Sequence, residues 1–373
     1  MNLREYQAKK IFSQYGIPIP QGEIVKTSKD AAESTRKFGC PVVLKPQLGV
    51  KGRGKVGGIG FADNPNTARA EAERLLMLTI KGESVQKFLV EEKIAITDEL
   101  YIAVTIDYST RQPVMITSSE GGMEIEEIAK TCPERLLRIP VNILTGPATD
   151  NLALIAEQMG KEAAKYLETL YRIFREYDAE IVEINPLVRT TDGNFYAVDA
   201  VLNVNGDSVF RHEDILILKK EIPVDDPIAE EASRYNWTYI DLPGDIGILS
   251  SGAGLTMAIL DIIHKAGGSP ANFLDTAQID DEGIYKAFDL LSRVKKIRVL
   301  LVNIFAGLNQ CDQLALGIRR YLNDYPVEIP LVVRMAGNLE EEGHRLLKEI
   351  GIKPFSRIED AVEQAVKLSK VIK

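Results

Sequence analysis

The feature that most constrains the fold lies in the last third of the chain, where short apolar runs alternate with helical patterns. The apolar runs cover residues 246–249, 271–274, 299–302 and 331–333, and the helical patterns lie near 253–266, 281–293, 312–322 and 339–350. A strand buried on both faces is apolar throughout, and a helix is the usual connection between two such parallel strands. The pattern therefore predicts βαβ units that form a parallel sheet with helices on both faces.

The first part of the chain has a mixed α+β pattern. An amphipathic helix is expected over residues 3–15, ending at Gly16, and an alanine- and leucine-rich stretch at about 67–79 is also helical. Short β-rich runs at 42–45, 88–91, 100–107 and 113–117 indicate strands of antiparallel character. A chain of 373 residues exceeds the size at which one hydrophobic core stops growing. Charges and prolines interrupt the periodicity between about 214 and 237, so we expect one domain at 1–236 and a second at 237–373.

A long helix and a hairpin close the first domain. Apolar residues recur at helical spacing from 154 to 177, which predicts one continuous helix with one buried face. Strands are expected at 180–188 and 195–204, joined by the turn signal Thr191-Asp192-Gly193-Asn194. A three-residue turn sets Asn185 opposite Asp199, whereas a two-residue turn sets it opposite Ala200.

Charge and cysteine content exclude several classes of protein. A net charge of −9 disfavours a nucleic-acid partner, because phosphate backbones are held by excess Lys and Arg. The three cysteines, Cys40, Cys132 and Cys311, are widely separated and odd in number, which fits neither a disulfide framework nor a zinc site and favours the reducing cytoplasm. No apolar run has membrane-spanning length, so no membrane partner is expected.

A strand that ends in a lysine leads directly into a loop rich in glycine and positive charge. Lys45 closes the run 42–45, and residues 49–58 read Gly-Val-Lys-Gly-Arg-Gly-Lys-Val-Gly-Gly. Glycines let backbone N–H groups approach an anion, and the lysines and arginine supply countercharge, which predicts a phosphate site. A flexible basic surface loop is the alternative. The loop is no P-loop, because Val56 stands where a magnesium-binding Ser or Thr is required, so metal ligands must come from elsewhere.

The hairpin can supply those ligands. Glu183 and Asn185 are two apart on a strand and project from the same face, and Asp199 joins them in the register of the three-residue turn. Oxygen ligands gathered on one face suit magnesium carried in with a nucleotide. The alternative is a polar, solvated hairpin face.

Several motifs together resemble a known family. They are the strand lysine with its Gly-Arg-Gly-Lys loop, Glu120-Gly121-Gly122 followed by Ile125-Glu126, Glu-Ile-Asn-Pro-Leu-Val at 183–188, Gly252-Ala253-Gly254-Leu255, and Val302-Asn303-Ile304-Phe305. In this order, over nearly the whole chain, they resemble the β subunit of succinate–CoA ligase of the ADP-forming type, an ATP-grasp acyl-CoA synthetase. The resemblance implies an α/β protein with an N-terminal ATP-grasp domain and a flavodoxin-like CoA-ligase domain.

The resemblance also implies roles for individual residues. Nucleotide phosphates would be held by Lys45, Gly52, Arg53 and Gly54, the nucleoside by Glu91, Ile94 and Glu99, and Mg²⁺ by Asn185 and Asp199. Glu183 would face a phosphohistidine when that residue reaches the nucleotide, and is the implied catalytic residue. The nucleotide would be ATP/ADP, with GTP as the alternative.

The family's phosphohistidine should lie in a companion α subunit. Of the three histidines here, His212, His264 and His344, none sits in a glycine-rich loop suited to a phosphorylated nucleophile. The chain is therefore expected to act only with an α subunit, in an αβ or α2β2 assembly, with CoA bound mainly by that partner. The acid would be succinate or a related dicarboxylate.

The second domain carries an expected substrate edge. Ser250-Ser251-Gly252-Ala253-Gly254 follows a strand and opens a helix, the geometry of an anion site. By resemblance, Ser251, Gly307, Leu308 and Asn309 would bind substrate near the phosphorylated site. The sequence departs from the family at Ser251, usually asparagine, at 277–279, usually three glycines, and at Ala306, usually glycine, which puts the identity of the acid in doubt.

Two further readings compete with a succinate-specific subunit. One is a subunit of a related malate–CoA ligase, citryl-CoA synthetase or ATP-citrate lyase. The other is a non-catalytic nucleotide-binding regulatory subunit, in which the altered turns have abolished turnover.

Overall fold

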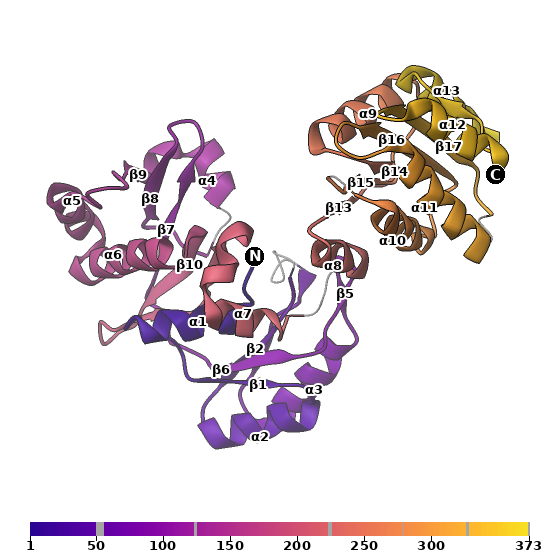
Figure 1. The fold of residues 1–373 in the computed structure, drawn as a ribbon. Coiled ribbons are helices and arrows are strands. Elements are labelled where there is room, and N and C mark those ends of the chain that lie inside the picture. Colours follow the sequence, from indigo (N-terminus) through magenta and orange to yellow (C-terminus); the bar gives the residue numbers. More distant parts are fainter. Residues whose placement is uncertain (50–55, 123–124, 223–225, 278, 326–327, 372–373) are drawn as a thin grey trace. The chain divides into compact units, whose positions relative to one another are not determined.

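The computed structural model describes residues 1–49, 56–122, 125–222, 226–277, 279–325 and 328–371, which form two compact units, Met1–Pro223 and Val224–Lys373 (Figure 1). The division lies within the interrupted segment 214–237, but before the 236/237 boundary expected from the sequence. The reason is α8 (Pro227–Arg234), which packs on β13 (Thr238–Asp241) and places Ala232 in the core of the second unit.

The first unit begins with α1 (Glu5–Gln14), which confirms the helix predicted at 3–15, and contains a four-stranded antiparallel sheet. Its strands, in the order β1-β6-β2-β3, are β1 (Gly22–Val25), β6 (Phe88–Glu92), β2 (Val42–Pro46) and β3 (Gly60–Ala62). Helices α2 (Ser28–Phe38) and α3 (Pro65–Leu76) pack on one face, where their alanines meet the apolar side chains of β2 and β6. Alternation along β2 then leaves Val43 and Lys45 on the opposite face.

A six-stranded antiparallel sheet forms the rest of the first unit. Its strands are β7 (Asp98–Asp107), β8 (Gln112–Ser118), β9 (Leu137–Pro140), β10 (Ala179–Arg189), β11 (Phe195–Ala197) and β12 (Val201–Val204), in the order β11-β10-β7-β8-β9, with β12 also paired to β10. The shorter elements of the unit are β4 (Thr79–Ile80), β5 (Glu83–Ser84), α4 (Ile125–Thr131), η2 (Pro133–Arg135), η3 (Gly206–Arg211) and α7 (Glu213–Lys219).

The single helix predicted over 154–177 is wrong, because the segment forms two helices. These are α5 (Thr149–Met159) and α6 (Lys161–Glu176), and Gly160 between them has φ 93° and ψ 153°, outside the helical region. Only glycine adopts such a conformation without steric penalty. Both helices still bury apolar faces in the core of the six-stranded sheet, as the periodicity indicated.

The strand predicted over 195–204 is also interrupted. Residues 198–200 separate β11 from β12, yet both strands pair with β10 in one register, with Leu187 opposite Ala197 and Glu183 opposite Val201. The turn N–H of Gly193 donates to Thr190 O, and the N–H of Thr190 donates to Asn194 O. This is the register of the three-residue turn, so Asn185 and Asp199 occupy matching positions.

The second unit confirms the predicted parallel sheet. Strands β15 (Asn272–Asp275), β14 (Ile246–Ser250), β16 (Val299–Ala306), β17 (Leu331–Gly337) and β18 (Pro354–Phe355) lie side by side in that order, the flavodoxin-like order 2-1-3-4-5, and β13 adds an antiparallel edge beside β15. Helices α10 (Asp281–Ser292), α11 (Cys311–Asp324) and α12 (Glu340–Glu349) pack in one core, and α9 (Ala253–Lys265) and α13 (Ile358–Val371) in another. Helices therefore cover both faces of the sheet.

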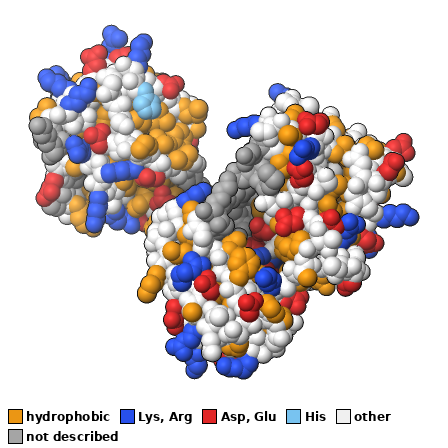
Figure 2. Space-filling view, turned by 180° about the vertical axis from the view of Figure 1, so that it is seen from behind, with side chains coloured by type: hydrophobic (Ala, Val, Ile, Leu, Met, Phe, Trp, Pro, Cys, Tyr) orange, Lys and Arg blue, Asp and Glu red, His pale blue; other side chains and the backbone are white. Residues whose placement is uncertain are grey.

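The surface and the helices bear on possible partners. Figure 2 shows acidic and basic side chains interspersed on the visible faces of both units. Among the residues that the structure describes, every helix is too short or too polar to cross a lipid bilayer.

Candidate functional site

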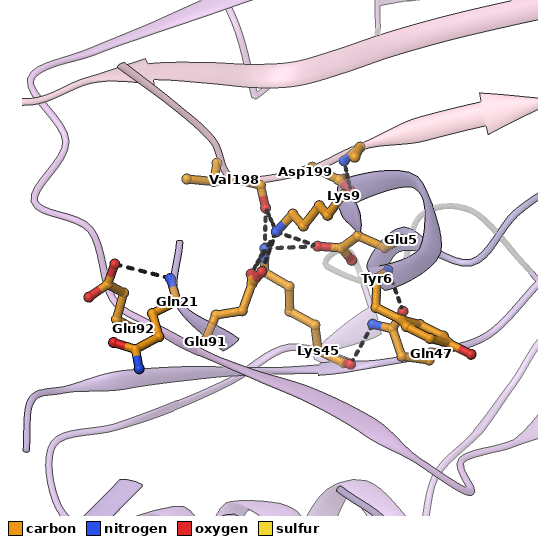
Figure 3. Close-up of polar contacts among 11 residues, drawn as sticks. Glu5, Tyr6, Lys9, Gln21, Lys45, Gln47, Glu91, Glu92, Val198 and Asp199 are labelled. Atoms are coloured by element: carbon orange, nitrogen blue, oxygen red, sulfur yellow. Dashed lines mark hydrogen bonds and ion pairs between the residues drawn. The ribbon is translucent and has the colours of Figure 1, made fainter. Parts of the chain in front are cut away.

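Lys45 lies near the end of β2 and points away from α2 and α3, toward α1 and the β11–β12 segment (Figure 3). Its Nζ is 3.0 Å from Oε1 of Glu5 and 2.9 Å from Oε2 of Glu91, and it also donates to the carbonyl oxygen of Val198. Only 13% of the side chain is exposed. The strand lysine thus joins three parts of the first unit that are far apart in the sequence.

A second lysine shares the same acceptors. Lys9 Nζ lies 2.6 Å from Oε1 and 2.7 Å from Oε2 of Glu91, 3.1 Å from Oε1 of Glu5, and 2.7 Å from Val198 O. We call Glu5, Lys9, Lys45 and Glu91 the buried ion cluster, because Glu5, Lys9 and Glu91 are at most 5% exposed. Two ammonium groups and two carboxylates balance in charge, as buried charges generally must.

The two lysines of the buried ion cluster have different electrostatic environments. Burial alone would lower the pKa of Lys45, but the carboxylates of Glu5, Glu91 and Asp199 outweigh it and raise that pKa well above its usual value. The pKa of Lys9 is lowered, first by burial and then by the charge of Lys45. Lys45 is therefore firmly cationic, as a phosphate-binding lysine must be.

The break between β11 and β12 places a carbonyl and a carboxylate beside this cluster. Residues 198–200 leave the ladder, and the Val198 carbonyl accepts from both Lys9 and Lys45. The next residue, Asp199, is half-buried, and its Oδ1 accepts the N–H of Ala200 at 2.8 Å. The break between β11 and β12, which the sequence did not predict, thus allows the Val198 carbonyl to accept from both lysines of the buried ion cluster.

Asn185 and Asp199 fit the oxygen chemistry of Mg²⁺. Asn185 is half-buried, and its Oδ1 accepts the N–H of Gly122 at 2.8 Å. Magnesium is commonly held by one or two protein oxygens, with phosphates and water completing its octahedron. In the described part of the chain, no group of three or more His, Cys, Asp or Glu could hold a metal ion. Glu183, two residues before Asn185 on β10, is half-buried.

The motif Glu120-Gly121-Gly122 lies against the strands that carry these residues. The N–H of Gly121 donates to Glu99 O at 2.8 Å, and a Cβ at Gly121 would come within 2.6 Å of Leu100 O. Gly122 has φ 74°, and a Cβ there would meet Glu99 Oε2 at 2.2 Å. Gly121 is required for the close approach to the backbone of Glu99 and Leu100, and the positive φ of Gly122 favours glycine there. Together they position the N–H of Gly122 on Asn185.

The residues expected at the nucleoside span the connection between the two sheets. Glu91 lies on β6, Ile94 is half-buried in the connecting segment, and Glu99 is half-buried on β7. Glu99 lies close to Gly122. The Glu91 carboxylate, in contrast, forms ion pairs with Lys9 and Lys45. Gly52, Arg53 and Gly54 of the expected phosphate loop lie outside the described residues.

Sequence reasoning missed Lys9, Glu5 and Gln47. Glu5 and Lys9 are four apart on α1, which on sequence alone resembles an ordinary surface pair. Gln47 is 5% exposed; its Oε1 accepts the N–H of Tyr6 at 3.2 Å, and its Nε2 donates to Lys45 O at 2.9 Å. The available signal was a glutamate and a lysine on the side of α1 that also carries Ala8 and Phe12.

In the second unit, the expected substrate residues meet at the carboxyl ends of β14, β15 and β16, where open α/β sheets bind ligands. Asp275 Oδ1 accepts the N–H groups of Gly252 and Ala277, both at 2.8 Å. The N–H of Phe305 lies 3.4 Å from Ser251 Oγ, which links the ends of β14 and β16 at the switch point of the strand order.

The remaining expected residues follow β16. Gly307 and Leu308 are exposed, Leu308 at 78%, and Asn309 is half-buried with its Nδ2 donating to the carbonyl of Ile279. The structure thus gathers Ser251 and the 307–309 turn at one edge of the sheet, with Asn309 tied to the loop that follows Asp275.

The two altered turns differ in their demands on the backbone. Ala277 has φ 51°, in the left-handed region that favours glycine. Ala306 is 2% exposed and belongs to the core beside α11. The alanine at 277 therefore strains the backbone, whereas the methyl group of Ala306 is packed.

Comparison with known proteins decides the family. A model of the ATP-grasp domain matches residues 2–189, and a CoA-ligase model matches 249–371. The β subunit of succinate–CoA ligase [ADP-forming] from Ignicoccus hospitalis is 40% identical over 99% of this chain and 100% of its own. The chain belongs to the succinate–CoA ligase β-subunit family.

Membership of this family confirms the expected fold, an N-terminal ATP-grasp domain followed by a flavodoxin-like CoA-ligase domain, and makes the chain a relative of nucleoside diphosphate-forming CoA ligases. The GDP-forming β subunit of Thermus thermophilus is 38% identical over 93% of both chains. The structure of ATP citrate lyase from Methanothrix soehngenii, with citrate and coenzyme A, aligns with a TM-score of 0.73 at 18% identity, covering 98% of this chain and 99% of that one. That likeness concerns the fold alone.

Proposed function

We propose that this chain is the nucleotide-binding β subunit of a succinate–CoA ligase that works with an α subunit carrying a phosphorylated histidine. The observation that carries the proposal is the convergence of Lys45 with the β10–β12 hairpin, which bears Asn185 and Asp199. Phosphoryl transfer needs positioned positive charge more than covalent help from the protein, and this site supplies it.

Each residue then has a defined task. The Lys45 ammonium neutralises phosphate charge, and Asn185 and Asp199 would hold a magnesium ion, which on binding screens the charge of the phosphate oxygens. Glu183 would accept a hydrogen bond from the imidazole of the partner's histidine and so fix its tautomer. Gly52, Arg53 and Gly54 would complete the phosphate site, and Glu91, Ile94 and Glu99 would border the nucleoside.

The need for a partner is supported by the contacts of the chain's own histidines. His212 Nε2 lies 2.7 Å from Asp178 Oδ2, and His344 Nε2 lies 2.7 Å from Met335 O, while His264 lies in the last turn of α9. These positions suit packing better than phosphoryl transfer. We infer an αβ or α2β2 assembly in the cytoplasm, with the α subunit holding most of the CoA.

In the second unit, Ser251, Gly307, Leu308 and Asn309 would help to hold the dicarboxylate. The sheet edge offers a helix N-terminus after Gly252 and the exposed turn after β16. Ala277 lies at the same edge, where its N–H donates to Asp275 Oδ1. This is the observation that favours testing acids other than succinate.

The decisive experiment co-expresses the chain with a succinate–CoA ligase α subunit. We expect ADP or GDP release only when CoA and a dicarboxylate are both present, and no thioester from the β chain alone. A panel of succinate, malate, citrate and itaconate, each with ATP and with GTP, selects the acid and the nucleotide. Magnesium-dependent nucleotide binding without turnover on any acid would instead favour the regulatory reading.

A further inference from the structure

Lys45 has no hydrogen-bond donor to spare in the arrangement seen. An ammonium group carries three N–H donors. Those of Lys45 are directed at Glu5 Oε1, Glu91 Oε2 and Val198 O. Lys45 can therefore bind a phosphate oxygen only if it breaks its contact with one of these three acceptors.

Lys9 is placed to take over every acceptor that Lys45 would release. It already contacts Glu5, both oxygens of Glu91 and the Val198 carbonyl (Figure 3). A buried carboxylate that loses its only partner is strongly destabilised, whereas one that keeps a second ammonium is not. The duplication of partners is what makes release of Lys45 energetically feasible.

We propose that Lys9 is a positioning residue for nucleotide binding: it retains Glu5 and Glu91 while Lys45 turns to a nucleotide phosphate. This rests on the proposed function of Lys45. Without Lys9, Glu5 and Glu91 lose the ammonium that they share with Lys45, and they hold Lys45 away from the nucleotide. With Lys9 present, the buried ion cluster stays neutral until the nucleotide arrives.

Substitution of Glu5 is the matched test, because it should change nucleotide affinity in the opposite direction to substitution of Lys9. Glu5 contacts both lysines, at 3.1 Å for Lys9 and 3.0 Å for Lys45, and it lies on α1 outside the residues assigned to nucleotide, metal or acid. Removing its charge frees Lys45 instead of trapping it. If the buried ion cluster had only a structural role, loss of either Lys9 or Glu5 would weaken nucleotide binding through local unfolding.

The test measures binding of Mg·ATP by calorimetry to the assembled αβ enzyme, for wild type, Lys9→Met, Glu5→Gln and the double variant, with thermal unfolding recorded for each. We expect the Lys9→Met Kd to rise about tenfold, and the double variant to return to within about threefold of wild type. Glu5→Gln alone is expected to leave the Kd unchanged or lower it. Lys37→Met, which removes an exposed ion pair with Glu23 in the same unit, is the control and should leave the Kd unaltered.

An unchanged Kd in folded Lys9→Met, or a double variant no better than Lys9→Met, would overturn the proposal. If Lys9→Met does not fold, Glu5→Gln and Lys9→Arg test the proposal instead. The proposal fails if Glu5→Gln weakens Mg·ATP binding about tenfold. It also fails if Lys9→Arg, which keeps the positive charge, weakens binding by that much. Failure of the proposed function is distinguishable, because wild type itself would then show no heat with Mg·ATP.

Discussion

The Nζ atom of Lys45 lies 2.9 Å from Oε2 of Glu91, so the residues expected at opposite ends of a nucleotide form an ion pair with each other. The pairing follows from the sheet register. Lys45 is opposite Leu89, and Glu91 is two residues further along β6 on the same face. The pair holds the strand lysine at a fixed position beside the hairpin, and under our proposal this ion pair must break when Lys45 binds a nucleotide phosphate.

Replacing Lys45 by Met should abolish most nucleotide use. The variant removes the cation at the phosphate site, and we expect kcat/KM for Mg·ATP to fall about 10²-fold or more in the αβ enzyme. It also removes the ion pairs of Lys45 with Glu5 and Glu91, so the thermal midpoint should fall. Lys37→Met, with 63% of the native side chain exposed, is the matched control. Wild-type kcat/KM in folded Lys45→Met would rule out the phosphate role.

Replacing Asp199 by Ala should raise the magnesium requirement. Asp199 supplies a carboxylate at the hairpin position matching Asn185, and we expect the Mg²⁺ concentration for half-maximal activity to rise about tenfold or more. Asp192→Asn, at the exposed tip of the same hairpin, serves as the control. Equal magnesium curves for Asp199→Ala and wild type would count against its ligand role.

Gly122→Ala should weaken the same site through crowding. Gly122 and Gly16 both have positive φ, 74° and 80°, but a Cβ meets Glu99 Oε2 at 2.2 Å only at Gly122. Gly16→Ala should destabilise by about 1 kcal/mol, whereas Gly122→Ala should in addition push the Glu99 carboxylate aside and displace the N–H that Asn185 accepts. Urea unfolding and magnesium titration measure the two effects. Similar results for both variants would show that backbone conformation alone matters.

Glycine at the two altered turns should have opposite effects on stability. Ala277→Gly removes the strain of an alanine in the left-handed region, although glycine adds entropy to the unfolded chain and so offsets part of the gain. We expect the free energy of unfolding to rise by about 0.5 kcal/mol. Ala306→Gly removes a buried methyl group and should cost about 1 kcal/mol. Denaturant unfolding of the chain measures both. A loss at 277 as large as that at 306 would contradict the strain at Ala277.

Cys311 should make stability fall at alkaline pH. Burial, followed by the charges of Glu340 and Asp312, raises the pKa of its thiol to about 11, whereas an unfolded cysteine titrates near ~8.5. Between these values the folded state binds more protons than the unfolded state, so the free energy of unfolding decreases as pH rises from about 8.5 to 11. Cys311→Ala should flatten that slope in urea titrations at several pH values, and an unchanged slope would exclude Cys311 as its source.

Local patterns predicted much of the fold correctly. The alternation after residue 246 became a parallel sheet with helices on both faces, because strands buried on both sides must be apolar whatever their neighbours are. The break at Gly160 was missed, since a single glycine inside an apolar period is compatible with a continuous helix until the backbone is seen. The break at 198–200 was missed for a similar reason, because Asp199 and Ala200 are flanked on both sides by residues that favour strands.

The sequence by itself determined the two kinds of domain, the family, and the strand and hairpin that carry Lys45, Asn185 and Asp199, because periodicity, turn residues and short motifs are local properties. Only the tertiary structure decided that Glu5, Lys9, Lys45 and Glu91 form one buried ion cluster on the Val198 carbonyl. Those contacts join residues up to 189 positions apart, and whether a charge is buried depends on which segments pack around it.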